Sequence, residues 1–270
     1  MNGPTPLLDL FKRGEVERDV RLLAAQGALA PRAHEQLGIL IHLLEDSDEE
    51  IRRVANETLS RIPEAALRAF LARSDVPIAV RDFFANRGVV PAGTAAAEAE
   101  DPLIDVSPDV VEDVPAAAVA GGGEDESEAD QRRMSINQQL TKMAFTDKLK
   151  AAAKGTREMR AILIRDPSKM ISATVLSSPK LSEQEVESFS RMTNVAEDVL
   201  RSIGHNRAWI KNYGVVVGLT KNPKTPLAMS MNFLSRLNDR DLTLLSMDRN
   251  IPEPLRVAAR KRVVAATQKK

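Results

Sequence analysis

The feature that most constrains this chain is a repeat of 28 residues in its C-terminal half. Turn-forming residues stand 28 positions apart, and we call them the anchors: Asp166, Asn194, Asn222 and Asn250. Apolar residues recur five positions before and five positions after each anchor. A period of this length accommodates two helices of about ten residues and two short turns. Because one such hairpin cannot bury its apolar stripe alone, the pattern predicts an α-solenoid of stacked helical hairpins.

Local signals indicate where the helices of each hairpin begin. Ser182 with Glu185 has the form of a capping box, and Asn238 with Asp241 is a weaker version. Prolines directly follow the first and third anchors, which predicts that these anchors cap the second helix of their hairpins. We therefore expect the anchors to be structural residues.

The N-terminal part of the chain also reads as helical and repetitive. Apolar residues between Leu37 and Leu44 follow the i, i+3, i+4, i+7 spacing of a buried helix face. An acid, an apolar residue five positions later and then an arginine occur twice, in Asp46–Arg52 and again in Asp75–Arg81. The two copies are 29 residues apart and predict a second helical-repeat module.

These short patterns also resemble a known family. The residues that resemble HEAT-type helical repeats are Asp46, Ile51, Arg52 and Ala55, then Asp75, Val80 and Arg81, echoed by Pro252, Leu255, Arg256 and Ala259. The block from Asn222 to Leu227, with Trp209 and Tyr213 ahead of it, is similar to uncharacterised bacterial proteins built from such repeats. The resemblance implies a scaffold that binds other macromolecules, and it implies no catalytic residue.

Charge divides the chain into three segments, although the formal net charge of the whole is zero. Residues 88–131 contain 12 acids and no Lys or Arg, and they are rich in Ala, Pro and Gly. This composition predicts an acidic disordered linker between an N-terminal module, 1–87, and a C-terminal module, 132–270. The C-terminal module has 26 basic and 12 acidic residues, a net charge of +14.

Catalytic, cofactor and metal sites have little support in the sequence. Cysteine is absent, which excludes thiolate metal sites and a cysteine nucleophile. The chain has no glycine-rich phosphate loop, no paired-histidine metalloprotease motif and no nucleophile elbow. His34 and His42 could share a helix face but have no third ligand. We therefore expect no enzyme activity, no cofactor and no bound metal.

Basic residues accompany the anchors and form the candidate partner-binding set. Three of the four residues that directly precede an anchor are basic, and two lysines follow in the next turns, so the set is Arg165, Lys169, Lys221, Lys224 and Arg249. Such a ridge can meet an acidic protein or phosphates, and the alternative is an ordinary solvated face. Trp209, Met231 and Met247 fall on apolar repeat positions and are expected to fill the core.

The sequence therefore predicts an all-α, non-catalytic scaffold that binds an acidic or extended protein partner through its basic C-terminal module. The alternative is sequence-independent nucleic-acid binding by that module, although aromatic residues are few. A third hypothesis is that the acidic linker docks on the basic module and masks it. Without a secretory leader or a span-length apolar stretch, a cytoplasmic location is expected.

Overall fold

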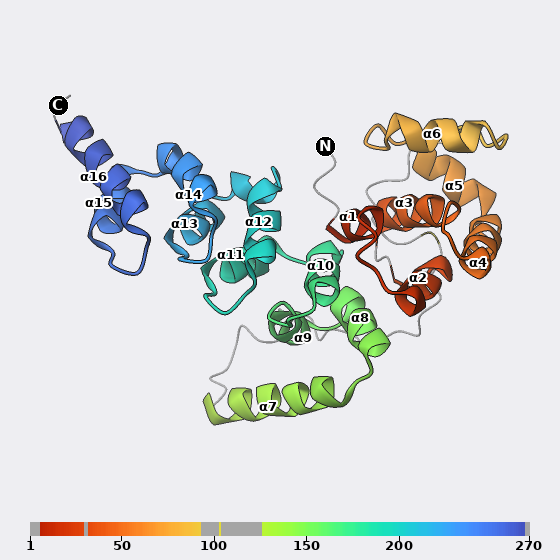
Figure 1. Cartoon of the computed structure of the whole chain (residues 1–270), viewed down its shortest axis with the longest axis horizontal. Helices are drawn as coiled ribbons and strands as arrows, with labels where there is room; N and C mark the ends of the chain where they lie inside the picture. The colour runs from red at the N-terminus through yellow and green to blue at the C-terminus, as the bar shows by residue number, and fades with distance from the viewer. Residues whose placement is uncertain (1–5, 30–31, 93–102, 104–125, 268–270) are drawn as a thin grey trace. The chain divides into compact units, whose positions relative to one another are not determined.

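A computed structural model describes residues 6–29, 32–92, 103 and 126–267. These residues form sixteen α-helices and the 3-10 helices η2 and η3, and no strand occurs among them (Figure 1). The predicted all-α class is therefore confirmed for this part of the chain. The finer prediction of two α-solenoid modules stays a prediction.

The chain divides into two compact units. Unit 1 comprises Met1–Leu163 with Met170–Lys180, and unit 2 comprises Ile164–Lys169 with Leu181–Lys270. The division therefore runs through the first C-terminal hairpin, whereas the sequence analysis places module boundaries at 87 and 132. Those module boundaries stay a prediction.

Unit 1 contains ten helices among its described residues. Their bounds are α1 (Pro6–Lys12), α2 (Arg18–Ala25), α3 (Ala33–Leu43), α4 (Glu49–Ser60), α5 (Glu64–Leu71), α6 (Ile78–Ala85), α7 (Glu126–Lys142), α8 (Phe145–Lys154), α9 (Arg157–Leu163) and α10 (Lys169–Ser177). The predicted apolar face of α3 is confirmed in part, since Leu37 and Leu40 are buried while Ile41 and Leu44 are half-buried, and Leu43 is buried instead. Helices α1, α2 and α4 all pack on α3, so this helix forms the centre of the N-terminal core.

The two arginines of the repeated N-terminal pattern make equivalent contacts. Arg52 donates from Nη1 to the carbonyl oxygens of Asp46 (2.6 Å) and Ser47 (3.1 Å), just before its own helix. Arg81 likewise donates from Nη2 to the carbonyl oxygen of Arg73. In both copies the recurring arginine therefore binds backbone carbonyls in the loop that follows the preceding helix.

Helix α7 overlaps the C-terminal end of the predicted linker. It begins at Glu126, so residues 126–131 of that segment belong to the helix, and the linker itself stays a prediction. Residues 126–131 include Glu, Ala and Gln, which are strong helix formers. The rest of the predicted linker, at 93–102 and 104–125, lies outside the described residues.

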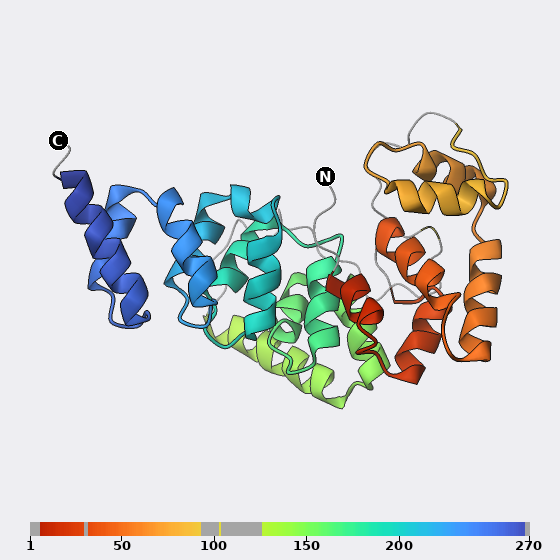
Figure 2. The same cartoon turned by 45° about the horizontal axis from the view of Figure 1, so that its top comes forward.

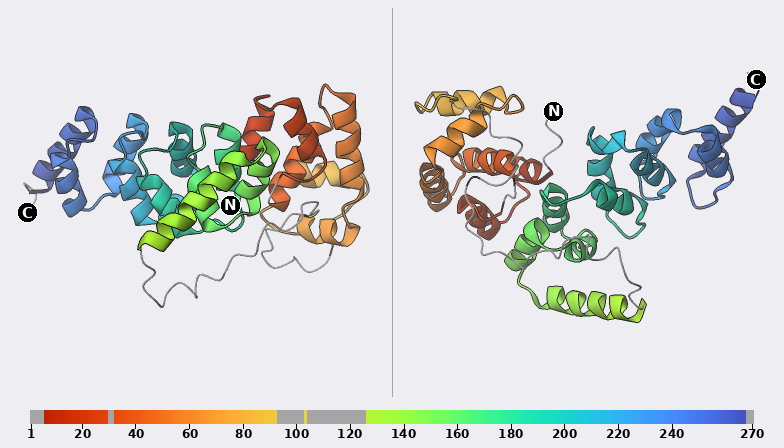
Figure 3. Two further views of the ribbon diagram at one scale, coloured as in Figure 1. Left: turned by 90° about the horizontal axis from the view of Figure 1, so that it is seen from below. Right: turned by 180° about the vertical axis from the view of Figure 1, so that it is seen from behind.

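Unit 2 contains three helical hairpins in succession (Figures 2 and 3). Their helices are α11 (Glu183–Arg191) and α12 (Glu197–His205), α13 (Tyr213–Lys221) and α14 (Leu227–Phe233), and α15 (Asp239–Met247) and α16 (Glu253–Thr267). We call the first helix of each hairpin helix A and the second helix B. Contacts join α11 to α13 and α14 to α16, so the first and second hairpins pack mainly through their A helices and the second and third through their B helices.

The structural repeat keeps the mean period but not the predicted register. The loop from helix A to helix B has five residues in each hairpin, 192–196, 222–226 and 248–252. These loops begin 30 and then 26 residues apart, which averages 28. Asn222 therefore opens its loop, whereas Asn194 and Asn250 are the third residues of theirs. The four anchors are not structurally equivalent.

This shift overturns several local predictions. Helix α14 begins at Leu227 and α10 at Lys169, so the prolines after the anchors do not start helices. Instead, Asp166 accepts a turn hydrogen bond from the Ser168 amide (2.9 Å). Asn222 donates to the carbonyls of Ser190 (2.9 Å) and Met192 (2.8 Å), and so joins its loop to the preceding hairpin. These two anchors are structural residues, but as turn residues rather than helix caps.

The predicted caps of the A helices are confirmed. Ser182 and Glu185 form the full capping box of α11, and the Asn238 side chain accepts from the Asp241 amide at the start of α15. Asn212 caps α13 in the same way, accepting from the Gly214 amide at 2.8 Å. Each cap satisfies a backbone donor that the first helical turn leaves free.

The contact between α11 and α13 depends on glycine. A Cβ atom on Gly218 would lie 2.1 Å from Ser190 Oγ and 3.1 Å from Arg191 Cγ of α11, and one on Gly214 would lie 2.4 Å from Glu187 Cδ. Helix α15 carries larger residues at the two equivalent positions, Arg240 and Leu244. Leu244 is 51% exposed, so α15 does not bury this position as α13 does.

We predict that Gly218→Val destabilises the chain by about 1–3 kcal/mol, because the added side chain must displace Ser190 or separate α11 from α13. The matched control is Ser188→Val, at the equivalent but exposed position of α11, which should stay within about 0.5 kcal/mol of wild type. Urea denaturation of the full chain measures both. Equal effects of the two substitutions would contradict the close contact.

Candidate binding surface

The predicted partner-binding residues Lys221, Lys224 and Arg249 lie on the loops between helices A and B or at a helix end, and Arg165 and Lys169 lie likewise between α9 and α10. Arg165 and Arg249 are exposed, and neither has an ion-pair partner among the described residues. Lys169 pairs with Asp198 (3.4 Å) and Lys221 with Asp241 (3.0 Å). Lys224 donates to the Val195 carbonyl at 3.4 Å. The five residues are therefore not equivalent, and two of the charges are balanced by carboxylates.

The Lys221–Asp241 pair belongs to a polar cluster that joins α13 to α15. The Tyr213 hydroxyl donates to Asp241 Oδ2 at 2.6 Å and accepts from the Asn238 amide at 3.1 Å. The Tyr213 hydrogen bond, followed by that of Lys221, lowers the pKa of Asp241, while partial burial opposes this shift. Partial burial raises the pKa of Tyr213. The cluster therefore keeps Asp241 ionised and holds the two hairpins together.

A second group of cations gathers where each helix B leads into the next helix A. We call this group the basic edge, and its members are Arg207, Lys211, Arg236 and Arg240. All four are exposed and lack an ion-pair partner within the described ranges. Arg236 donates from Nη2 to the Ile210 carbonyl, which places the 207–213 and 236–241 segments side by side.

Sequence reasoning missed the basic edge because it looked for repeats relative to the anchors. Arg207 and Arg236 are 29 residues apart, as are Lys211 and Arg240. Within each connection between hairpins the two cations lie four positions apart, Arg207 with Lys211 and Arg236 with Arg240. A search at spacings slightly off 28 residues could have found this signal.

Unit 2 also exposes aliphatic side chains on adjacent B helices. We call this group the apolar face: Leu227 and Met231 of α14, with Val257 and Val264 of α16, which are 38–50% exposed. The prediction that Met231 and Met247 fill the core is wrong, since Met247 is 70% exposed. Trp209 is half-buried in η2 (Trp209–Lys211) and is not equivalent to Leu181 and Leu237, each of which directly precedes a cap residue.

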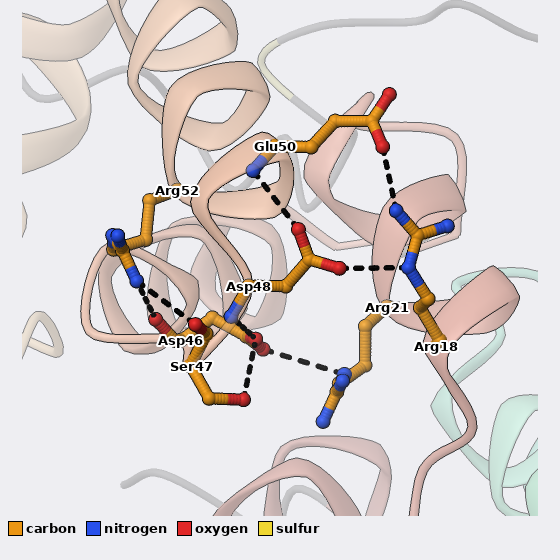
Figure 4. Close-up of polar contacts among 7 residues, drawn as sticks. All are labelled: Arg18, Arg21, Asp46, Ser47, Asp48, Glu50 and Arg52. Carbon is orange, nitrogen blue, oxygen red and sulfur yellow. Dashed lines mark hydrogen bonds and ion pairs between the residues drawn. The ribbon is translucent and has the colours of Figure 1, made fainter.

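Figure 4 shows a polar network that joins helices α2 and α4 of unit 1. Arg18 of α2 contacts Asp48 Oδ2 (2.7 Å) and Glu50 Oε2 (2.6 Å), and Arg21 lies 3.3 Å from Asp46 Oδ2. The Arg18 hydrogen bond is the largest cause that lowers the pKa of Asp48, which also caps α4 by accepting from the Glu50 amide. Acids and arginines are matched here, so the network fixes α4 against α2.

The described residues offer no group of three or more His, Asp or Glu side chains arranged to hold a metal ion. His42 contacts the Phe11 carbonyl through Nε2 at 3.1 Å, and burial lowers the pKa of His34. Both histidines therefore belong to the packing of α3. No helix in the described ranges has the length and apolar character needed to cross a membrane.

Comparisons of the chain with protein-family models, with curated proteins and with solved structures find no match. The HEAT-like resemblance therefore stays a prediction, and function has to be argued from the surface of the chain itself.

We predict that Asp241→Asn destabilises the chain at pH 7, because it removes the carboxylate that Tyr213 and Lys221 stabilise. A lowered folded-state pKa contributes stability above the unfolded pKa of about 3.9, and that stability is lost as pH falls through the folded value. The difference between wild type and Asp241→Asn should therefore shrink below about pH 4.

Denaturation midpoints at several pH values measure this difference. The matched control is Asp239→Asn, which removes a charge two residues away without removing a side-chain hydrogen bond of the cluster. A difference that stays constant between neutral and acidic pH would contradict the role of the Asp241 carboxylate.

Proposed function

We propose that the chain is a non-catalytic adaptor that binds a protein partner through its C-terminal helical repeats, an α-solenoid in architecture. The observation that supports this best is the occurrence, in one unit, of exposed aliphatic side chains and of four exposed cations that have no ion-pair partner among the described residues. Cations attract an acidic partner, and aliphatic contacts supply the water-excluding part of a protein interface.

The basic edge is the better docking candidate than the ridge expected from the sequence. Lys169 and Lys221 form ion pairs with Asp198 and Asp241. Their positive charges are therefore largely neutralised, which weakens the attraction of the predicted basic ridge for an acidic partner. Among the residues that the structure describes, the four cations of the basic edge have no such partners. Arg165 and Arg249 stay available on the opposite loops and give a natural comparison.

The test is quantitative affinity capture with the full chain. We expect proteins that wild type retains to be lost with Arg207→Glu/Arg240→Glu, because charge reversal repels an acidic partner. The control is Arg165→Glu/Arg249→Glu, which reverses the same number of exposed charges on the other loops and should retain those proteins. If no captured protein distinguishes the basic-edge variant from the control, the proposal fails.

The second candidate is nucleic-acid binding, and the same four cations favour it. If each met one phosphate, affinity should fall roughly 100-fold between 50 and 200 mM salt. Base stacking has less support than protein binding, because the apolar face is aliphatic and the Tyr213 hydroxyl is hydrogen-bonded to Asp241. Fluorescence anisotropy with labelled single-stranded and duplex DNA or RNA decides, and no binding at about 50 mM salt eliminates this candidate.

A further inference from the structure

The outward positions of the B helices change character along unit 2. The first and fifth residues of α12 are Glu197 and Arg201, which form an ion pair (2.5 Å) with both side chains about half exposed. The same positions of α14 hold Leu227 and Met231, and the fifth position of α16 is Val257. A solvated salt bridge is therefore replaced by uncovered aliphatic side chains on the next two helices.

The residues of the apolar face lie on neighbouring surfaces. Helices α14 and α16 are in contact, and Met231 and Val257 hold the same position in their helices, so we expect them to lie on the same side of the unit. Leu227 and Met231 are one helical turn apart, and Val264 lies two turns beyond Val257. The apolar face is therefore a strip across two helices rather than a scatter of single residues.

Cations lie at both ends of the residues Leu227, Met231 and Val257. Arg260 and Lys261 lie one helical turn beyond Val257 on α16, between it and Val264, are exposed and have no ion-pair partner in the described part of the chain. Lys224 is exposed just before α14. Glu253 is the acid at the first position of α16, and Arg256 pairs with it at 3.2 Å. Leu227, Met231 and Val257 are therefore the apolar centre of the strip, and Lys224, Arg260 and Lys261 are its positive border.

We propose that the apolar face binds an amphipathic helix of a partner protein whose apolar stripe is flanked by Asp and Glu. Charge complementarity selects this occupant, because acidic flanks meet Arg260, Lys261 and Lys224 while the stripe covers Met231 and Val257. A basic helix would meet like charges at the same border. This inference rests on the proposed adaptor function and names the surface and the chemistry of the partner.

The probe is a fluorescein-labelled helical peptide of about 16 residues with Leu along one face and Glu on both flanks. Anisotropy with the full chain should show saturable binding, and a peptide with Lys in place of Glu should bind at least tenfold more weakly. Met231→Glu should weaken binding of the Glu-flanked peptide at least tenfold, because it puts a like charge in the centre of the strip.

The matched control is Met247→Glu, which places the same charge on an exposed methionine of α15 and should leave the affinity unchanged. Equal losses in both variants, or no binding up to about 100 μM peptide, would overturn the assignment. Circular dichroism of both variants identifies unfolding, and Met231→Lys, which keeps the border positive, should also weaken binding if the aliphatic side chain is needed.

Two further outcomes separate this inference from others. Light scattering of wild type that shows a dimer, lost in Met231→Glu, would assign the apolar face to a second copy of this chain and overturn the partner helix. If capture depends on Arg207 and Arg240 while the peptide does not bind, the adaptor function stands and this inference fails.

Discussion

Unit 2 depends on burying the apolar stripe of each hairpin against its neighbour, and the quality of that contact varies along the chain. Gly214 and Gly218 let α13 approach α11 to within the reach of Ser190 and Glu187. In α15 the equivalent residues are Arg240 and Leu244, so a polar cluster around Asp241 links α13 to α15 instead. A contact of this second kind leaves aliphatic side chains such as Leu244 in solvent. The exposed aliphatic side chains of unit 2 therefore lie in its second and third hairpins.

Much of this fold could be predicted from local signals. The 28-residue mean period, the Ser182 capping box and the Asn238 cap all correspond to features of the structure. The register could not be predicted, because the five-residue loop between helices A and B is constant while the rest of the repeat varies. Helix α12 and its exit are each two residues longer than α14 and its exit, so repeats of 30 and 26 residues average to 28. Anchors chosen by residue type therefore fall at different places in the loop, the first for Asn222 and the third for Asn194 and Asn250. The helix starts predicted from the anchors are wrong for the same reason.

The candidate surface was harder to predict than the fold, because charge pairing is not local in sequence. Lys221 lies 20 residues from Asp241, and only the packing of one hairpin on the next brings them together. Conversely, the 207–213 and 236–241 segments collect four cations because Tyr213 and Arg236 bridge the two connections. A net charge of +14 indicated an excess of cations, but only the structure separates those already paired from those available.

Hydrogen–deuterium exchange of the full chain tests the central claim most directly, because it locates a binding event on the chain. In the presence of the acidic amphipathic peptide, the account predicts slower exchange in α14 and α16, with no change in α11, where Gly214 and Gly218 already hold α13. Protection confined to helices outside α14 and α16, or no protection at a peptide concentration that saturates binding, would contradict it.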